Sequence, residues 1–260
     1  MSVFYHELRQ NRLALIIWTA IISFMLGVAI LIYPEMKTQM NEISDMFSNM
    51  GSFSDAFGMT ELNFGEFIGY FAVECGNVLG MGGAFFAAIL GVSALAKEER
   101  DRTAEFLLTH PIPRRRIVWE KLLAVFAQIA VLNVAVGVFT LACIAIIGEK
   151  ADKSVFWMLF AYLLMQFVIA GITFGVSAFV TNGAMGIGIG FAAYMYFLNI
   201  IANLTDAVKF LKYLTPFAFA DGAYITKHNA LEVRYLAVGA LFAIVGIAAA
   251  FWQYERKDIA

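Results

Sequence analysis

The stretch Leu13–Tyr33, which reads LALIIWTAIISFMLGVAILIY, decides the class of fold. It contains no charged side chain and directly follows Arg12. A helix rises 1.5 Å per residue, so about 20 mostly apolar residues cross the hydrocarbon core of a bilayer. The stretch therefore predicts a membrane-spanning helix near the start of the sequence.

Further apolar runs of similar length follow, and their interiors carry almost no charge. The six predicted spans are about 13–33, 70–96, 117–147, 155–180, 184–202 and 235–252. An Asp, Lys or Arg at the centre of a spanning helix costs roughly 2.5–3.5 kcal/mol on insertion scales, which explains the missing charges. We expect an all-α integral membrane protein with six transmembrane helices, in which residues 1–260 form a single domain.

The composition excludes the other broad classes of protein. Hydrophobic residues make up 61% of the 260 residues, charged residues make up 15%, and the mean hydropathy is +0.76. Soluble chains are about 45–50% apolar and about 25% charged, and disordered chains are less hydrophobic still. A net charge of −2 also argues against a nucleic-acid partner, because phosphate binding needs a basic surface.

The basic residues predict the orientation of the spans. Six spans place the N-terminus, the segment 97–116, the turn 181–183 and the C-terminal tail on one side. That side carries most of the basic residues, namely Arg9, Arg12, Lys97, Arg100, Arg102, Arg114, Arg115, Arg116, Lys121, Arg256 and Lys257. Positively charged connections stay in the cytoplasm, so we expect both termini to be cytoplasmic. The two large outer segments would then be 34–69 and 203–234.

The residues before the first span predict an N-terminal interfacial helix over Ser2–Asn11. Its apolar face, turned to lipid or protein, would carry Val3, Phe4 and Leu8. Its polar face, turned to water, would carry Glu7, Arg9 and Gln10.

Glycine pairs four residues apart predict close helix packing inside the membrane. These pairs are Gly76/Gly80, Gly171/Gly175 and Gly186/Gly190.

The loop between the second and third spans carries the most information about function. Glu98–Leu108 reads as an amphipathic helix that continues the second span, and Pro111 and Pro113 end it. Arg114, Arg115 and Arg116, with Lys121 one turn later, would anchor the third span at the lipid headgroups.

This loop resembles that of the permease subunits of ABC-2 type ABC exporters. The residues that carry the resemblance are Glu98, Glu99, Arg100, Thr103, Glu105, Phe106, Leu107, Leu108, Pro111, Arg114, Arg115, Arg116 and Lys121. The stretch Tyr213–Phe217 before the last span, the six spans and the cytoplasmic termini are similar as well.

The resemblance implies that Glu98–Leu108 is a coupling helix that seats in a groove of a separate ATPase subunit. Phe106, Leu107 and Leu108 would be buried in that groove. Ion pairs at its rim would involve Glu98, Glu99, Arg100 and Glu105, with Thr103 on the same helix. The resemblance also implies short re-entrant helices before the sixth span, and a multi-pass protein of the bacterial plasma membrane.

The chain contains no Gly-x-x-x-x-Gly-Lys-Ser/Thr phosphate loop, so it cannot hydrolyse ATP by itself. We expect no catalytic residue and no cofactor on this chain, with ATP and Mg on the partner ATPase. We also expect no metal site, because His6, His110 and His228 lie in three different connections without ligand spacing.

The resemblance further implies a second permease copy or a paralogue, with the substrate between the two and the second and fifth spans lining its path. The aromatic and methionine residues of these spans are Phe71, Met81, Phe85, Phe86, Met185, Phe191, Tyr194, Met195, Tyr196 and Phe197. Such a wall suits export of an amphipathic or hydrophobic cargo, such as a peptide, a toxin or a drug-like molecule.

Two other functions fit the composition. A secondary transporter or channel-like bundle would need charged groups at the membrane midplane or broken helices around a site. The notable polar candidates are Gln128, Asn133, Gln166, Asn199 and Asn203. A membrane sensor or anchor subunit that transports nothing is the other alternative.

Overall fold

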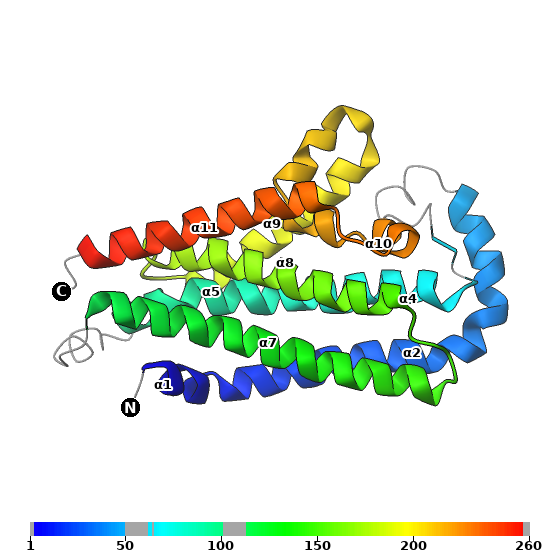
Figure 1. Ribbon diagram of the computed structural model, residues 1–260, viewed down its shortest axis with the longest axis horizontal. Helices are drawn as coiled ribbons and strands as arrows, with labels where there is room; N and C mark the ends of the chain where they lie inside the picture. Colours follow the sequence, from blue (N-terminus) through cyan, green and yellow to red (C-terminus); the bar gives the residue numbers. More distant parts are fainter. Residues whose placement is uncertain (1–2, 50–61, 64, 101–112, 257–260) are drawn as a thin grey trace.

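The computed structural model describes residues 3–49, 62–63, 65–100 and 113–256 of the chain. Within these ranges every regular element is a helix, and six helices are long and apolar enough to cross a membrane. The helices lie alongside one another in an elongated bundle (Figure 1). The predicted all-α membrane class is confirmed.

Each predicted span has its helix. The first span lies in α2 (Arg12–Asn49), and the second consists of α4 (Phe67–Cys75), the π-helix η1 (Gly76–Met81) and α5 (Gly82–Arg100). The other spans are α7 (Arg114–Ile146), α8 (Lys153–Ser177), α9 (Ala184–Leu204) and α11 (Val233–Arg256). The third span begins earlier than predicted, since arginine side chains can lie along apolar surface while their charged ends stay in water.

Helix α2 continues beyond Tyr33, where the first span was predicted to end, and Pro34 lies inside it. Proline removes one helical hydrogen bond and favours a bend. Figure 1 shows α2 turning sharply at the end of the bundle opposite to both termini. We call this the distal end, and the end that carries both termini the terminal end.

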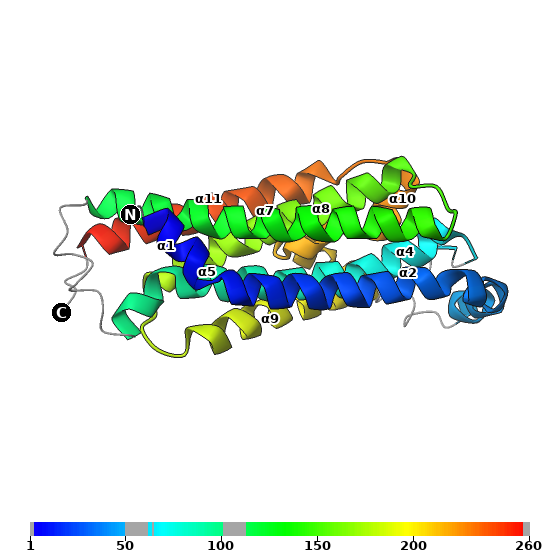
Figure 2. The ribbon, with the colours of Figure 1, turned by 90° about the horizontal axis from the view of Figure 1, so that it is seen from below.

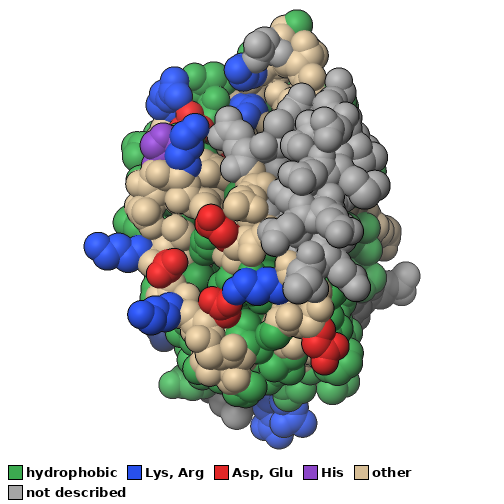
Figure 3. All heavy atoms as spheres, turned by 90° about the vertical axis from the view of Figure 1, so that its right-hand side faces the viewer, with side chains coloured by type: hydrophobic (Ala, Val, Ile, Leu, Met, Phe, Trp, Pro, Cys, Tyr) green, Lys and Arg blue, Asp and Glu red, His purple; other side chains and the backbone are tan. Residues whose placement is uncertain are grey.

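The distal end carries charged side chains of both signs (Figure 3). One ion pair there joins Lys37 Nζ to Glu149 Oε1 at 3.0 Å and connects the first span to the connection between α7 and α8. Charges of this kind indicate a surface beyond the lipid core, because they would be costly inside it.

The second span lies at the centre of the bundle. In its most apolar stretch of 18 residues 67% of the residues are buried, whereas the corresponding share is 17% in both α9 and α11. Helix α5 packs mainly on α8 and α9, and α8 packs in turn on α11. The exposed faces of the outer helices are apolar, which suits contact with lipid or with another transmembrane protein.

Close packing of α8 on α11 depends on glycine. A Cβ atom on Gly175 would lie only 2.6 Å from the Gly246 Cα atom, and one on Gly171 would lie 2.9 Å from the Ala243 Cβ atom. The predicted close approach at this glycine pair is therefore confirmed. Gly76 and Gly80 instead face the side chain of Tyr162, whereas Gly186 and Gly190 have no neighbour within 4 Å of an added Cβ.

Three short helices precede the last span, namely η2 (Asp206–Tyr213), η3 (Pro216–Ala220) and α10 (Gly222–His228). All residues of η3 are buried, and this helix packs against α8, α9 and α11. The Thr215 hydroxyl donates to the Met195 carbonyl oxygen at 2.8 Å and so fixes the start of η3 to α9. Phe217 is buried while Phe210 is exposed, so η3, and not η2, re-enters the bundle.

Candidate functional site

A buried carboxylate joins three helices at the terminal end. Glu7 lies in the short helix α1 (Val3–Gln10), which lies beside α7 (Figure 2). Its Oε1 atom accepts a hydrogen bond from Lys121 Nζ of α7 at 2.9 Å. Its Oε2 atom accepts a hydrogen bond from Lys97 Nζ near the end of α5. We call these residues the Glu7 cluster.

Further bonds fix the two lysines of the Glu7 cluster. Lys121 Nζ also donates to the Ala94 carbonyl oxygen at 2.7 Å, which joins α7 to α5 directly. Lys97 Nζ also donates to Gln10 Oε1 at 2.8 Å. Helices α1, α5 and α7 therefore meet at one carboxylate through charge-assisted hydrogen bonds.

The Glu7 cluster is almost completely removed from solvent. Glu7 is 3% exposed and Lys121 is 0% exposed. Burial raises the pKa of the Glu7 carboxyl, but the nearby ammonium groups of Lys121 and Lys97 outweigh burial, and the pKa lies below its ordinary value. The carboxylate is therefore ionised at neutral pH, and the two ammonium groups compensate its charge.

Two predictions are wrong here. Glu7 does not face water, because it lies four residues after the buried Val3 and hence on the same face of α1. Lys121 does not anchor the third span at the headgroups, because its side chain is buried against α5 and α1. The sequence signal that could have predicted the cluster was a carboxylate on the same face of α1 as Val3, together with lysines at the ends of two spans.

The arginine triplet is held by protein contacts. Arg114 Nη1 donates to the carbonyl oxygens of Tyr254 and Glu255 in the last turn of α11, both at 3.3 Å. Arg115 forms an ion pair with the Glu255 side chain. A cation at this position favourably opposes the negative end of the α11 dipole.

The third arginine is linked to α1. Arg116 Nε donates to Glu120 Oε1 at 2.8 Å, and Glu120 Oε2 accepts from the Phe4 backbone N–H at 3.1 Å. The start of α7 is thus fixed to both ends of the chain, through α1 and through α11. Arg115 and Arg116 remain largely exposed, so contact with lipid headgroups remains a prediction for them.

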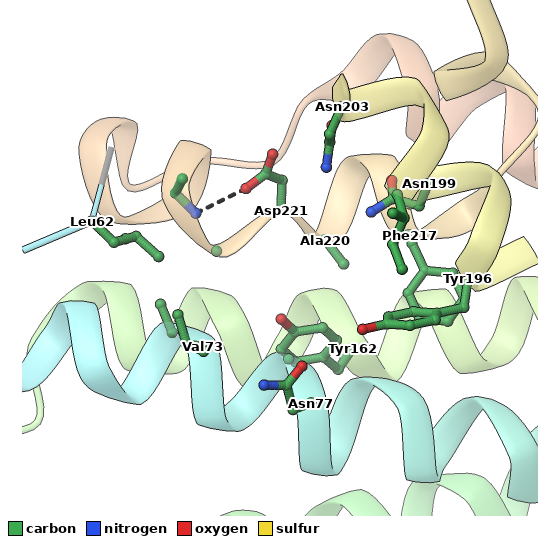
Figure 4. A pocket seen from close by; sticks show the side chains of 15 residues that line it. Leu62, Val73, Asn77, Tyr162, Tyr196, Asn199, Asn203, Phe217, Ala220 and Asp221 are labelled. Carbon is green, nitrogen blue, oxygen red and sulfur yellow. Dashed lines mark hydrogen bonds between the residues drawn. The ribbon is translucent and has the colours of Figure 1, made fainter. Parts of the chain in front are cut away.

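A second feature is a small polar cavity of about 90 Å³ toward the distal end. Its walls come from α4, η1, α8, α9, η3 and α10 (Figure 4). The polar residues among its lining are Asn77, Tyr162, Tyr196, Asn199, Asn203 and Asp221. We call it the distal cavity.

The family comparison matches residues 1–259 to the family described as ABC-2 family transporter protein. This chain belongs to the ABC-2 transporter family. No curated protein matched the chain in the comparison. The protein is therefore a membrane subunit of a transporter, and such a permease is generally not itself catalytic.

The predicted coupling helix of this ABC-2 permease lies largely outside the described residues. Glu98, Glu99 and Arg100 form the last turn of α5, so the helix of the second span runs without a break into the predicted coupling segment. Thr103, Glu105, Phe106, Leu107 and Leu108 fall outside the described part of the chain. The Glu7 cluster lies directly beside the point where α5 leaves the described region.

The structure separates the predicted pathway residues of the permease into groups. Phe71 and Phe86 are buried inside the bundle, where their rings contact Phe67 and Trp18, so neither lies on its surface. Met81 and Phe85 are half-buried. On α9, Met185, Tyr194 and Phe197 are exposed.

Three of the predicted pathway residues meet in an apolar groove between α8, α9 and α11. Phe191, Tyr194 and Met195 line this groove of about 520 Å³. Phe179 and Phe242 also line it. The half-buried Tyr196 lies on a different face of α9 and lines the distal cavity instead.

The polar residues of the spans fall into two groups. Asn133 Nδ2 donates to Gln166 Oε1 at 2.6 Å and links α7 to α8, and Gln166 Nε2 lies 3.5 Å from the Leu79 carbonyl oxygen of η1. Gln128 Nε2 donates within its own helix, to the Ala124 carbonyl oxygen. These contacts give structural roles to three of the five candidates, while Asn199 and Asn203 line the distal cavity.

Proposed function

We propose that this ABC-2 permease is the membrane subunit of an ATP-driven exporter, and that a separate ATPase subunit binds its terminal end. The observation that carries the proposal is the Glu7 cluster beside the uninterrupted exit of α5 toward the predicted coupling helix. A segment that emerges as a continuous helix can transmit displacement as a rigid element.

The Glu7 cluster gives this displacement a route into the membrane. Lys97 lies in α5 and Lys121 lies in α7, so the cluster joins the two spans on either side of the predicted coupling helix. Because both ammonium groups bind the same carboxylate, movement of α5 would move α1 and α7 with it. We infer that ATP-dependent closure of the ATPase tilts these helices together.

We infer further that two permease copies, or this chain and a paralogue, form the transport unit. The exposed face of α9 supports this inference, because Gly186 and Gly190 leave space for a close approach by another helix. The orientation with cytoplasmic termini, proposed from the basic residues, would place the ATPase in the cytoplasm.

The cargo that we propose is amphipathic or hydrophobic, such as a peptide, a toxin or a drug-like molecule. The apolar groove supports this class, because its volume of about 520 Å³ lies within the range of about 300–1,000 Å³ for small-molecule sites. Its aromatic and methionine side chains can adapt to ligands of different shape.

Co-purification tests the assembly. The tagged permease is expressed together with an ABC ATPase subunit from the same genome, and the complex is captured at several salt concentrations. We expect the ATPase to co-purify, and Arg100→Glu to release it at lower salt because a rim charge is reversed. Lys150→Glu, on the connection before α8 at the distal end, is the matched control. Absence of an ATPase from the wild-type complex at every salt concentration would contradict the proposal.

A further inference from the structure

The distal cavity lies where the second, fourth and fifth spans meet the re-entrant segment. Gly76 and Asn77 belong to the π-helix η1, and Asp221 lies between η3 and α10. A π-helix inside an α-helical span is rare, and such interruptions occur often at functional sites. Because Asn77 is exposed, the cavity is not sealed from its surroundings.

Polar side chains around the distal cavity have unused hydrogen-bonding capacity. Among the described residues, no hydrogen bond is formed by the side chains of Asn77, Asn199 and Asn203 or by the hydroxyls of Tyr162 and Tyr196. Figure 4 shows both hydroxyls turned into the space below Asp221.

Tyr162 is the most informative of these residues. The residue as a whole is only 4% exposed, but its hydroxyl oxygen is accessible from the cavity and has no hydrogen-bond partner among the residues that the structure describes. A ligand or water in the cavity could therefore form a hydrogen bond with this hydroxyl. Gly76 allows this placement, because a Cβ atom there would lie 3.0 Å from the Tyr162 hydroxyl oxygen.

The charge of the lining favours a cation. Among the described residues that line the cavity, Asp221 supplies the one charged side chain, and none is Lys, Arg or His. Its Oδ1 atom accepts from the Ala223 N–H at 2.9 Å, which fixes the carboxylate at the start of α10.

Aromatic rings add to this preference. Tyr162, Tyr196 and Phe217 line the cavity, and the last two rings pack edge to face with centroids 5.5 Å apart. A ring face attracts an ammonium group, and amide and phenol oxygens accept its N–H bonds. An anionic group in the cavity would be repelled by the Asp221 carboxylate.

We propose that the distal cavity binds the protonated amine of an amphipathic cargo, with Asp221 as its counter-ion and Tyr162, Tyr196 and the asparagine side chains as hydrogen-bond partners. The inference rests on the proposed export function and specifies its cargo class as a cationic amphiphile. A volume of about 90 Å³ suits an ammonium group with a short carbon chain, so the apolar remainder of the cargo would lie outside the cavity.

Binding to the purified permease in detergent, without the ATPase, tests this site separately from transport. Three probes with four carbon atoms each are titrated and followed by ligand-observed NMR, namely n-butylammonium, n-butanol and butyrate. We expect butylammonium to bind at least tenfold more tightly than the other two. Equal binding of the three probes, or preference for butyrate, would overturn the cation site and leave the ATPase co-purification result unaffected.

Matched variants locate the probe. Asp221→Asn keeps an N-cap residue for α10 but removes the charge, so butylammonium affinity should fall at least tenfold. Tyr162→Phe should lower it severalfold. Asp152→Asn, an exposed aspartate before α8, should leave it unchanged. Unchanged affinity in a folded Asp221→Asn variant would overturn the assignment.

A variant that should bind more tightly complements these losses, because misfolding cannot explain a gain of affinity. Asn203→Asp adds a second carboxylate to the cavity wall on a half-buried position of α9. We expect it to tighten butylammonium binding by threefold or more and to leave butanol binding unchanged. A folded Asn203→Asp variant with wild-type affinity for butylammonium would contradict the site.

Discussion

Glu7 Oε1 and Lys121 Nζ lie 2.9 Å apart although 114 positions of sequence separate the two residues. Both side chains are buried, so neither water nor lipid headgroups compete for this ion pair. It joins the first helix of the chain to the third span, and Lys97 extends the same contact to the second span. The cluster therefore connects a short N-terminal helix to two spans, and a hydropathy profile, which reads each segment by itself, does not predict this contact.

The Glu7 cluster should contribute strongly to stability. Glu7→Gln removes the carboxylate and leaves the positive charges of Lys97 and Lys121 uncompensated by it, and breaking a buried ion pair in this way costs about 3–5 kcal/mol. We expect a lower thermal midpoint in detergent and faster proteolysis of the terminal end. Glu255→Gln, which breaks the exposed pair with Arg115, is the control and should unfold like the wild type. Equal midpoints for Glu7→Gln and the wild type would contradict the role of the cluster.

The same cluster predicts how stability depends on pH. The pKa of Glu7 lies below its ordinary value of 4.5, so the folded state holds the ionised form more strongly than the unfolded chain does. Its contribution is fully present above pH 4.5 and is lost as the pH falls through the lower pKa of the folded state. Thermal unfolding between pH 7 and pH 3 should therefore show an acid-sensitive component that Glu7→Gln lacks. Parallel curves for the two proteins would argue against it.

The packing of α8 on α11 gives a test of the bundle itself. Gly175→Ala places a Cβ atom 2.6 Å from the Gly246 backbone, and overpacking of this kind costs about 1–3 kcal/mol. Gly137→Ala is the matched control, because its nearest neighbour would lie at an ordinary 3.7 Å. We expect the thermal midpoint to fall for the first variant only. A tolerated Gly175→Ala would mean that the two helices separate more easily than the structure indicates.

Coupling to the ATPase is tested by Leu107→Asp, with Leu107→Met as the conservative control. The resemblance of the loop to ABC-2 permeases places Leu107 in an apolar groove of the ATPase, where a carboxylate would be desolvated without a partner. We expect Leu107→Asp to release the ATPase or to leave ATP hydrolysis without transport, while the permease still inserts. Wild-type transport by Leu107→Asp would remove the coupling helix from the account.

Hydropathy was sufficient for the spans because each one is a local run of apolar residues with a length set by the bilayer. The same pattern was insufficient for Glu7 and Lys121, since their burial depends on residues far apart in the sequence that meet only in the folded bundle. A charged residue in an amphipathic helix is usually exposed, and α1 departs from that rule because lysines from two other helices compensate its charge.

The candidate site, like the fold, could be predicted from the sequence only in part. The asparagines of α9 were recognised as polar groups within a span, but the distal cavity also needs the π-helix η1 and the buried position of η3. Neither follows from a periodic pattern. The apolar composition of α9 was enough to predict that its side chains could line a surface. The burial of Phe71 and Phe86 was not predictable in this way, because it depends on the central position of the second span.

The most direct test of the central claim is transport by the permease in liposomes, with and without its ATPase and MgATP. A panel of fluorescent amphipathic amines and peptides serves as cargo, and flux is measured for the permease alone, for the complex and for the Leu107→Asp complex. We expect flux with the wild-type complex and MgATP and none under the other conditions. Cargo flux through the permease alone, without nucleotide, would contradict the account.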